Sequence, residues 1–406
     1  MAGFVPPARA AHLVHLRNDA GQVLDQGLVL FFPAPRSFTG EDVAEFQIHG
    51  GRASVSAVLS ALSKLSGFRL AEPGEYTRRA FENGRMDLTA VEGLSDLIRA
   101  ETEAQRRQAL DQADGALRQL YERWARQITH ARAMVEAELD FSDEEDIPGS
   151  VADRIWPELQ RLESELSMHL SQAKAGEIVR GGFRIALVGP PNAGKSSLLN
   201  ALARRDAAIV SDMPGTTRDV VEVRLDIGGH LVILQDTAGL RDAQDEIERE
   251  GIRRSIDVAK NADLVLSLSD IRSPAEGNVP DLLQGISPLL IWTKSDLLDG
   301  GWRPESGLLL SSRTGEGLDE LLLYLGTTVS EAIGRAGEAL PTRERHASYL
   351  RTCQRELAIA IKNESLPIEV RSEYLRNAAT ALGRITGSVD VEDLLGVIFS
   401  EFCVGK

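Results

Sequence analysis

Residues 189–196 of this 406-residue chain read Gly-Pro-Pro-Asn-Ala-Gly-Lys-Ser, which fits the phosphate-binding pattern G-x-x-x-x-G-K-[ST]. The backbone N–H groups of such a loop face a phosphate, and the helix that follows adds positive potential. Lys195 is expected to reach the outer phosphates, and the Ser196 hydroxyl to ligate Mg²⁺. The loop predicts binding of a nucleoside triphosphate. Its alternative, a chance glycine turn, has to be judged from the surrounding sequence.

Four further polar segments follow in the order expected for such a site. The first, 211–219, reads Ser-Asp-Met-Pro-Gly-Thr-Thr-Arg-Asp. A threonine at this distance can complete the Mg²⁺ shell and sense the γ-phosphate; we favour Thr217, with Thr216 as the alternative. The second, Asp-Thr-Ala-Gly at 236–239, offers a carboxylate that can hold Mg²⁺ through water and a glycine N–H that can meet the γ-phosphate.

The last two segments indicate which base is bound. In Thr-Lys-Ser-Asp at 293–296, Asp296 would accept hydrogen bonds from the N1–H and exocyclic amine of guanine. Adenine lacks this donor pair, so the carboxylate selects GTP. Thr293 stands where asparagine is usual, and one hydroxyl cannot brace two loops as an amide does, so we expect weaker guanine affinity with specificity kept. A base-contacting loop is expected at 311–317, where Ser312 replaces the usual alanine.

Each segment alone is weak evidence, because a surface Thr-Thr or Lys-x-x-Asp is usually a solvated turn. Their common order, beside short apolar strand patterns, favours a mostly parallel sheet that binds its ligand at the carboxyl ends of its strands. The predicted GTP contacts are Asn192, Ala193, Gly194, Lys195, Ser196, Ser197, Ser211, Thr216, Thr217, Asp236, Thr237, Ala238, Gly239, Thr293, Lys294, Asp296, Ser311, Ser312 and Arg313.

The composition is that of an ordinary soluble protein, with 43% hydrophobic and 26% charged residues. No apolar run approaches the ~20 residues that span a bilayer, and the amino end is too short for a signal-peptide core. Two cysteines, Cys353 and Cys403, give no disulfide framework. A cytoplasmic protein without membrane partners is expected. The net charge of −16 gives no support for nucleic-acid binding.

The hydrophobic patterns predict three kinds of region around the nucleotide motifs. Strand patterns at 22–32 and 42–48 and a helix pattern over 54–67 indicate an α+β region at the amino end. Long helices are expected over 87–139 and 151–179, and another helical stretch opens at Pro341.

We therefore predict a Ras-like P-loop GTPase domain, with a mixed, mostly parallel sheet, inserted in an all-helical domain. An α+β domain precedes both. The predicted boundaries are 1–83 for the α+β domain, 84–180 and 339–406 for the two helical parts, and 181–338 for the GTPase domain.

Together these features resemble the MnmE (TrmE) family of tRNA modification GTPases over nearly the whole chain. Beyond the GTPase motifs, the resemblance rests on Ser-Phe-Thr-Gly-Glu-Asp at 37–42, His-Gly-Gly at 49–51 and Glu-Pro-Gly-Glu-Tyr-Thr-Arg-Arg-Ala-Phe at 72–81. The carboxyl end at 402–406 reads Phe-Cys-Val-Gly-Lys. A terminal Cys-x-Gly-Lys behind a helical domain that hosts a GTPase is highly specific.

The resemblance implies a K⁺-dependent GTPase that acts as a homodimer with the FAD-containing partner MnmG on the wobble uridine of certain tRNAs. The product would carry an aminomethyl or carboxymethylaminomethyl group at C5. Its one-carbon unit would come from 5-formyltetrahydrofolate or a related folate. GTP hydrolysis would drive conformational steps of the complex and not the tRNA chemistry itself.

The same resemblance gives a role in K⁺ binding to Asn192, Ser211, Met213 and Thr216. A cation held there would do the charge work of an arginine finger. Without the family, Asn192 is equally well explained as a loop residue that stabilises its own turn.

A catalytic role falls to Glu248, which would orient the attacking water because Leu240, directly after Asp-Thr-Ala-Gly, cannot. From the residues alone Glu248 is one of four acidic side chains within 245–250, and such a carboxylate also suits a helix start. Only the position within the family singles it out.

The family match also assigns a folate site and a residue for the modification chemistry. Glu45, Arg85 and Lys406 match folate contacts, and Cys403 matches the terminal cysteine. Their alternatives are a sheet-surface carboxylate, solvated cations and a small buried hydrophobe. Family members begin with several dozen more residues, including a first strand and an Arg-Gly loop near the folate. The resemblance therefore implies an α+β domain that is truncated at its start, with an exposed sheet edge and one missing folate contact.

Two other functions share some of these features. A ribosome-assembly GTPase would carry the same nucleotide motifs together with a basic RNA-binding module, and this chain has no strongly basic segment. A nucleotide-gated dimerisation scaffold would need no enzymatic partner and no tRNA.

Overall fold

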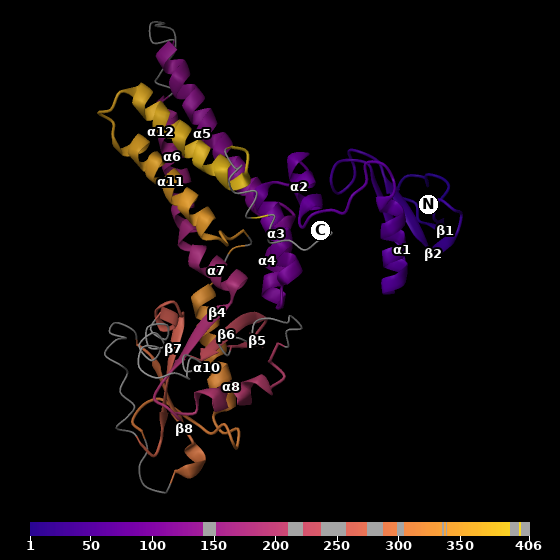
Figure 1. The fold of residues 1–406 in the computed structure, drawn as a ribbon. Coiled ribbons are helices and arrows are strands. Elements are labelled where there is room, and N and C mark those ends of the chain that lie inside the picture. The colour runs from indigo at the N-terminus through magenta and orange to yellow at the C-terminus, as the bar shows by residue number, and fades with distance from the viewer. Residues whose placement is uncertain are drawn as a thin grey trace, which may run out of the picture. The chain divides into compact units, whose positions relative to one another are not determined.

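The computed structural model describes residues 1–140, 152–209, 222–236, 257–273, 287–298, 304–334, 337, 339–389 and 398 (Figure 1). By its contacts the chain divides into two compact units, each described here by itself. The first comprises Met1–Ser95, Gln112–Gln160 and Thr352–Lys406, and the second Asp96–Asp111 and Arg161–Arg351. The predicted four-part domain division stays a prediction.

The first unit begins with a three-stranded antiparallel sheet in the order β1-β2-β3, formed by His12–Arg17, Val23–Phe32 and Val43–Gln47. Helix α1, Arg52–Ser63, packs on β2, and Leu16, Val29 and Val58 form the small core between them. The strands predicted at 22–32 and 42–48 are confirmed. Strand β1 was missed, because its two histidines interrupt the apolar alternation.

Beyond this sheet and α1, the described part of the first unit is mainly helical. Its helices include α2 (Glu75–Glu82), α3 (Leu88–Arg99), α5 (Ala116–Asp140) and α12 (Ile368–Thr386), and α5 packs along α12. Trp124 and Leu375 are among the side chains buried here. The helical stretch predicted over 87–139 consists of α3, α4 (Glu103–Ala113) and α5. Gly115, with φ of 91°, separates the last two.

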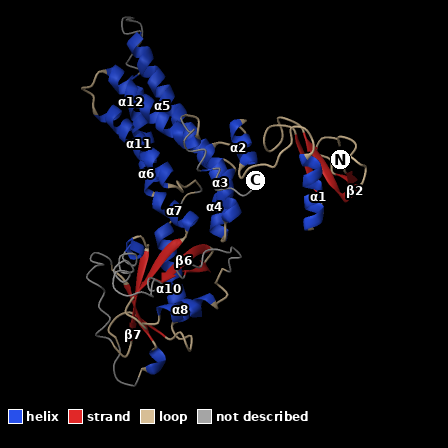
Figure 2. Cartoon of the chain, viewed as in Figure 1, coloured by secondary structure: helices blue, strands red, loops and turns tan. Residues whose placement is uncertain are grey.

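The second unit holds a six-stranded sheet in the order β5-β6-β4-β7-β8-β9. Figure 2 shows strands of this sheet in red, with β6 and β7 labelled. Only β5 runs antiparallel to its neighbour, and the other pairs are parallel. The predicted Ras-like, mostly parallel sheet is confirmed. Its strands and flanking helices are β4 (Phe183–Val188), α8 (Lys195–Ala203), β5 (Glu222–Ile227), β6 (His230–Asp236), β7 (Leu264–Asp270), β8 (Leu289–Thr293), β9 (Leu308–Leu310) and α10 (Leu318–Ile333).

Near-continuous apolar runs form the central strands of this sheet because both of their faces are covered. Leu187, Leu234, Leu266 and Ile291 are almost wholly buried in one core that α8 and α10 complete. In the described part of the chain, no helix has the length and apolar character needed to cross a membrane.

The chain enters and leaves the GTPase domain at one place. Helix α7, Ala173–Gly181, leads into β4, and residues 340–343 lead from the domain to α11, Glu344–Lys362. The Arg180 Nε donates to the Thr342 carbonyl (3.0 Å). A Cβ atom at position 176 would lie 2.3 Å from the Pro341 carbonyl oxygen, so the two segments meet backbone to backbone. This contact suits a domain inserted between two helical parts.

Replacement of Gly176 by alanine tests this contact. The added methyl group has to push the 340–341 segment away, which should cost about 1–3 kcal/mol of stability and lower the melting temperature. Gly181→Ala, in the same helix, is the matched control. Apart from the local helix backbone, no heavy atom lies within 4 Å of a Cβ atom added at this position. Equal melting temperatures for the two variants would contradict the close approach.

Acid sensitivity is predicted from His169 of helix α6, Ala152–Ser171. Burial, with the nearby His346 charge as a second cause, lowers the pKa of His169 from 6.5 to about 4. Between these pH values the unfolded chain takes up a proton that the folded chain refuses. Stability should therefore fall by about 3 kcal/mol as the pH drops from 6.5 to 4. Denaturant midpoints across this range should show a smaller loss in His169→Gln but the full loss in His130→Gln, whose side chain is exposed.

Candidate nucleotide-binding site

The loop between β4 and α8 adopts a conformation that glycine alone tolerates at two points. Gly189 has φ of 146° and Gly194, which precedes α8, has φ of 93°. A Cβ atom at position 189 would lie 2.3 Å from the Leu268 carbonyl oxygen of β7. Asn192 also has positive φ, 61°, which asparagine accepts more readily than most residues. The spacing of the motif is thus explained by close backbone approach and by left-handed turns.

Lys195 and Ser196 lie where the sequence predicts the phosphate and Mg²⁺ contacts. Lys195 is 5% exposed, and its ammonium group donates to the carbonyls of Gly189 (2.7 Å) and Pro190 (2.9 Å). These bonds hold the cation over the loop. The Ser196 hydroxyl donates to the buried Asp236 carboxylate at 3.0 Å. Two neighbouring oxygen ligands of this kind suit Mg²⁺.

Thr293, at the carboxyl end of β8, joins the phosphate loop to the sheet. Its Oγ1 lies 2.7 Å from the Ala193 carbonyl oxygen and 3.1 Å from that of Ser269 in β7. The hydroxyl thus lies within hydrogen-bond distance of both segments, and the expectation that it braces them less firmly than an amide stays a prediction. The hydroxyl still has one proton, so its donation is divided between two acceptors, whereas an amide would offer two N–H groups.

Lys294 adds a second link between the same segments. Its Nζ donates to the Asn192 carbonyl (2.9 Å) and to the Asp270 carboxylate at the end of β7 (2.7 Å). Hydrogen bonds from Arg272 and Lys294 hold the pKa of Asp270 well below its ordinary value. Asp270 and Arg272 were not predicted from sequence. The signal available was a charged residue at the end of an apolar strand, the position at which the other site residues stand.

Asp296, predicted to select guanine, is oriented by two neighbours. Ser311 Oγ donates to its Oδ1 at 2.5 Å, and an Arg313 nitrogen lies 2.6 Å from Oδ2. The Ser311 hydrogen bond and then the Arg313 charge lower the pKa of Asp296 below 3.8, so the carboxylate is ionised and ready to accept. Ser295 in turn donates to Glu316 (2.8 Å), which ties the two predicted base loops together. Ser311 therefore holds Asp296, a role that its motif did not reveal.

The remaining predicted residues divide into two groups. Ser197 is exposed on α8, and Ser312 is partly buried in the loop after β9. The residues that lie outside the described part of the chain are Ser211, Met213, Thr216, Thr217, Thr237, Ala238, Gly239, Glu248, Cys403 and Lys406.

Two of the predicted folate contacts lie in the first unit, and both are exposed. Glu45 stands on β3 opposite Leu30 of β2. Arg85 follows α2 and lines a pocket of about 310 Å³ together with residues that include Asp87 and Arg118. Glu45 is not among the residues that line this pocket, so the structure does not bring the two together there.

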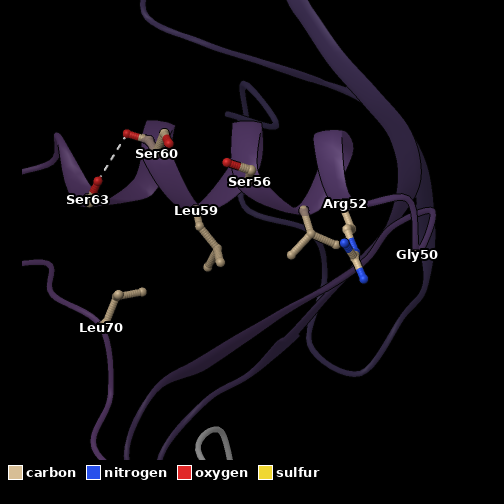
Figure 3. Close-up of a pocket in the computed structure, with 8 residues that line it drawn as sticks. Gly50, Arg52, Ser56, Leu59, Ser60, Ser63 and Leu70 are labelled. Atoms are coloured by element: carbon tan, nitrogen blue, oxygen red, sulfur yellow. Dashed lines mark hydrogen bonds between the residues drawn. The ribbon is translucent and has the colours of Figure 1, made fainter.

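Another pocket, of about 440 Å³, runs along α1. It is lined by Gly50, Arg52, Val55, Ser56, Leu59, Ser60, Ser63 and Leu70. Figure 3 shows Leu59 and Leu70 directed toward the same space beside the helix. Neither Glu45 nor Arg85 contributes to it, so it is separate from the predicted folate contacts.

The sheet order, the glycine-shaped loop and the Lys195, Asp236 and Asp296 positions define a P-loop GTPase of the Ras-like class. Residues 88–403 match the MnmE helical domain, and residues 2–85 match the GTP-binding protein TrmE N-terminus. The chain belongs to the MnmE family of tRNA modification GTPases. The family and the enzyme class predicted from sequence are thereby confirmed.

Relatives described as tRNA modification GTPase MnmE match the chain along its length. Those of Rhizobium johnstonii (strain DSM 114642 / LMG 32736 / 3841) and Rhizobium meliloti (strain 1021) are both 52% identical and align with 100% of this chain and 92% of their own. Among solved structures, the G domain of the T. maritima FeoB iron transporter shares 27% identity over 37% of this chain and 99% of its own, with a TM-score of 0.28.

The shared hydroxyl of Thr293 can be tested by Thr293→Val, which keeps the shape and removes the donor. Two buried carbonyls then lose a hydrogen bond, which should cost about 1–3 kcal/mol. Urea unfolding followed by tryptophan fluorescence measures the change. Thr327→Val is the control, because among the described residues the hydroxyl of that exposed threonine donates within its own helix, to the Leu323 carbonyl at 3.1 Å. A Thr293 variant no less stable than this control would show that the bridge contributes nothing.

Proposed function

We propose that this chain is a K⁺-dependent GTPase that acts with the FAD-containing protein MnmG to modify C5 of the wobble uridine of certain tRNAs. The observation that carries the proposal is the phosphate loop with Lys195, Ser196 and Asp236 in place, in a chain of the MnmE family. The ionised Asp296, held by Ser311, supports guanine as the base.

For the hydrolytic step, we assign a role to each residue from its position in the motifs. Lys195 faces the loop that would hold the outer phosphates. Ser196 would ligate Mg²⁺ directly and Asp236 through water, with Thr217 as the further ligand; the ion would neutralise charge on the phosphates. Glu248 would orient the attacking water, since Leu240 has no group that can do so.

The K⁺ site is proposed around Asn192, with Ser211, Met213 and Thr216. Asn192 sits in the phosphate loop, where its carbonyl accepts from Lys294. No hydrogen bond of its side-chain amide is found within the described residues, so its explanation as a self-stabilising turn residue gains no support there. A cation bound at this amide would supply positive charge as an arginine finger does.

We propose that the protein is a cytoplasmic homodimer and that the parts of the chain outside the GTPase domain take part in the tRNA chemistry. Exposed Glu45 and Arg85, with Lys406, would bind 5-formyltetrahydrofolate or a related folate, and Cys403 would take part in the modification. The wobble uridine would gain an aminomethyl or carboxymethylaminomethyl group. GTP hydrolysis would power conformational steps of the complex.

A comparison of GTP hydrolysis in KCl and in NaCl at equal ionic strength tests the proposal. We expect the rate in KCl to be higher by about 10²-fold, the scale on which one positioned charge or donor acts in a transition state. Asn192→Gly should lose this stimulation. Glycine is the suitable replacement, because alanine would be strained at φ of 61° and could fail for that reason alone.

Equal rates in the two salts would contradict the K⁺ dependence while leaving a GTPase. Absence of hydrolysis in both would contradict the enzymatic reading itself. Lys362→Gln, a change at the end of α11 in the helical part of the chain, serves as the control and should hydrolyse GTP like the wild type.

A further inference from the structure

The hairpin formed by β5 and β6 extends from the nucleotide site to the helical segment Asp96–Asp111 of the same unit. At one end Asp236, the last residue of β6, accepts the hydrogen bond of Ser196. At the other end the Gly229 carbonyl accepts from the Ala104 backbone N–H at 3.0 Å. Because β6 has seven residues, the two contacts are separated by about 20 Å of extended strand.

Strand β5 makes a second contact with the same helical segment. Its Arg224 lies 2.6 Å from a Glu101 carboxylate oxygen and 3.0 Å from Glu222 of its own strand. The other Glu101 oxygen is buried and has no hydrogen-bond partner within the described residues. Arg224 therefore supplies the ion pair on which this partly buried carboxylate depends, and a shift of Arg224 changes the environment of Glu101 directly.

Glu101 is joined to the start of α4 by hydrogen bonds, so a displacement of its side chain can be transmitted to the helix. The backbone N–H groups of Glu101 (2.9 Å) and Thr102 (3.2 Å) both donate to the Gln105 side-chain oxygen. The Gln105 amide nitrogen donates to the Arg180 carbonyl at 2.9 Å. These bonds link the Glu101 backbone to the first turn of α4 and, through Gln105, to α7.

The outer edge of β5 is held by the chain that follows α8. Ile209 N–H donates to the Arg224 carbonyl (2.9 Å), and Asp226 N–H donates to the Ala207 carbonyl (2.7 Å). Residues 210–221, which include the predicted γ-phosphate contact, connect these two segments along the sequence. The backbone that carries Arg224 is therefore hydrogen-bonded along its outer edge to Ala207 and Ile209, which directly precede that stretch in the sequence.

We propose that Glu101 and Arg224 are positioning residues through which the nucleotide at the phosphate loop controls the helical segment Asp96–Asp111. In this proposal the β5–β6 hairpin transmits the change. It acts on the helical segment through the Ala104–Gly229 backbone hydrogen bond and the Glu101–Arg224 ion pair. This coupling rests on the proposed GTPase function. It gives that function a route from the bound phosphates to a helical part of the chain that does not touch them.

Hydrogen–deuterium exchange of the full-length protein tests the coupling, with GDP or a non-hydrolysable GTP analogue at saturation. In the wild type, we expect the analogue to change the exchange of amides in the first turns of α4 by about fivefold, the lower end of allosteric coupling. Glu101→Gln and Arg224→Gln should remove this change. Arg224→Lys, which keeps the charge, should retain it.

Arg106→Gln is the matched control. It breaks a salt bridge of 2.8 Å to Glu103 within α4 and touches no strand of the sheet through that bond, so the nucleotide response should survive. A response that persists in both Glu101→Gln and Arg224→Gln, or a wild type whose α4 ignores the analogue, would overturn the proposal. If Arg224→Gln does not fold, Glu101→Gln and Arg224→Lys still decide it.

Analogue affinity and GTP hydrolysis are measured on the same samples, which separates the two ideas. A wild-type chain that binds the analogue but hydrolyses no GTP contradicts the proposed function, and its exchange data still decide the coupling. Variants that bind nucleotide normally but lose the α4 response support the coupling, because a merely structural role would weaken both.

Discussion

The conformation of the phosphate loop is the constraint on which the GTPase site depends, because this loop has little regular hydrogen bonding of its own. It is held from outside by the neighbouring strands. Gly189 lies directly against the Leu268 backbone of β7, Thr293 of β8 reaches the Ala193 carbonyl, and Lys294 reaches that of Asn192. The parallel register of β4, β7 and β8 brings these three strand ends together. Sheet order therefore determines the shape of the anion site.

Electrostatic balance around this loop follows from the same geometry. Lys195 and Lys294 bring two cations beside backbone carbonyls, and Asp270 and Asp236 supply the nearby carboxylates. Asp270 pairs with Lys294, whose ammonium also donates to the Asn192 carbonyl of the loop, and hydrogen bonds from Arg272 and Lys294 lower the pKa of Asp270. These contacts fix the ammonium group beside the phosphate loop, which lowers the reorganisation that phosphate binding requires.

Motif spacing singled out Lys195, Asp236 and Asp296, and their roles toward a nucleotide stay predictions. The structure places these residues at or shortly after the carboxyl ends of β4, β6 and β8, whose apolar runs are easy to recognise in the sequence. Motif spacing missed Ser311 as the support of Asp296, since that contact joins two loops whose approach depends on β8 and β9 pairing. The break between α3 and α4 was missed for a related reason. Glu101 and Thr102 are capped by the Gln105 side chain, a choice that helical periodicity does not encode.

The GTPase domain is connected to neighbouring helical segments by contacts that the nucleotide motifs alone do not reveal. Arg180 donates to Thr342 where the chain enters and leaves the domain, and Arg343 pairs with Asp96 at 2.8 Å in the helical segment that leads to α4. A domain that is joined to helices at one place can rotate there as a rigid body. If an edge of its sheet is also bonded to another helical segment, that segment has to respond to the rotation. Strand β5 is such an edge, because its Arg224 pairs with Glu101 and Gly229 in the turn that follows it accepts from Ala104. In the proposed coupling, a change at the nucleotide reaches the helical segment through these two contacts. Coupling of this kind needs no long pathway of side chains, because a single two-stranded ribbon spans the distance.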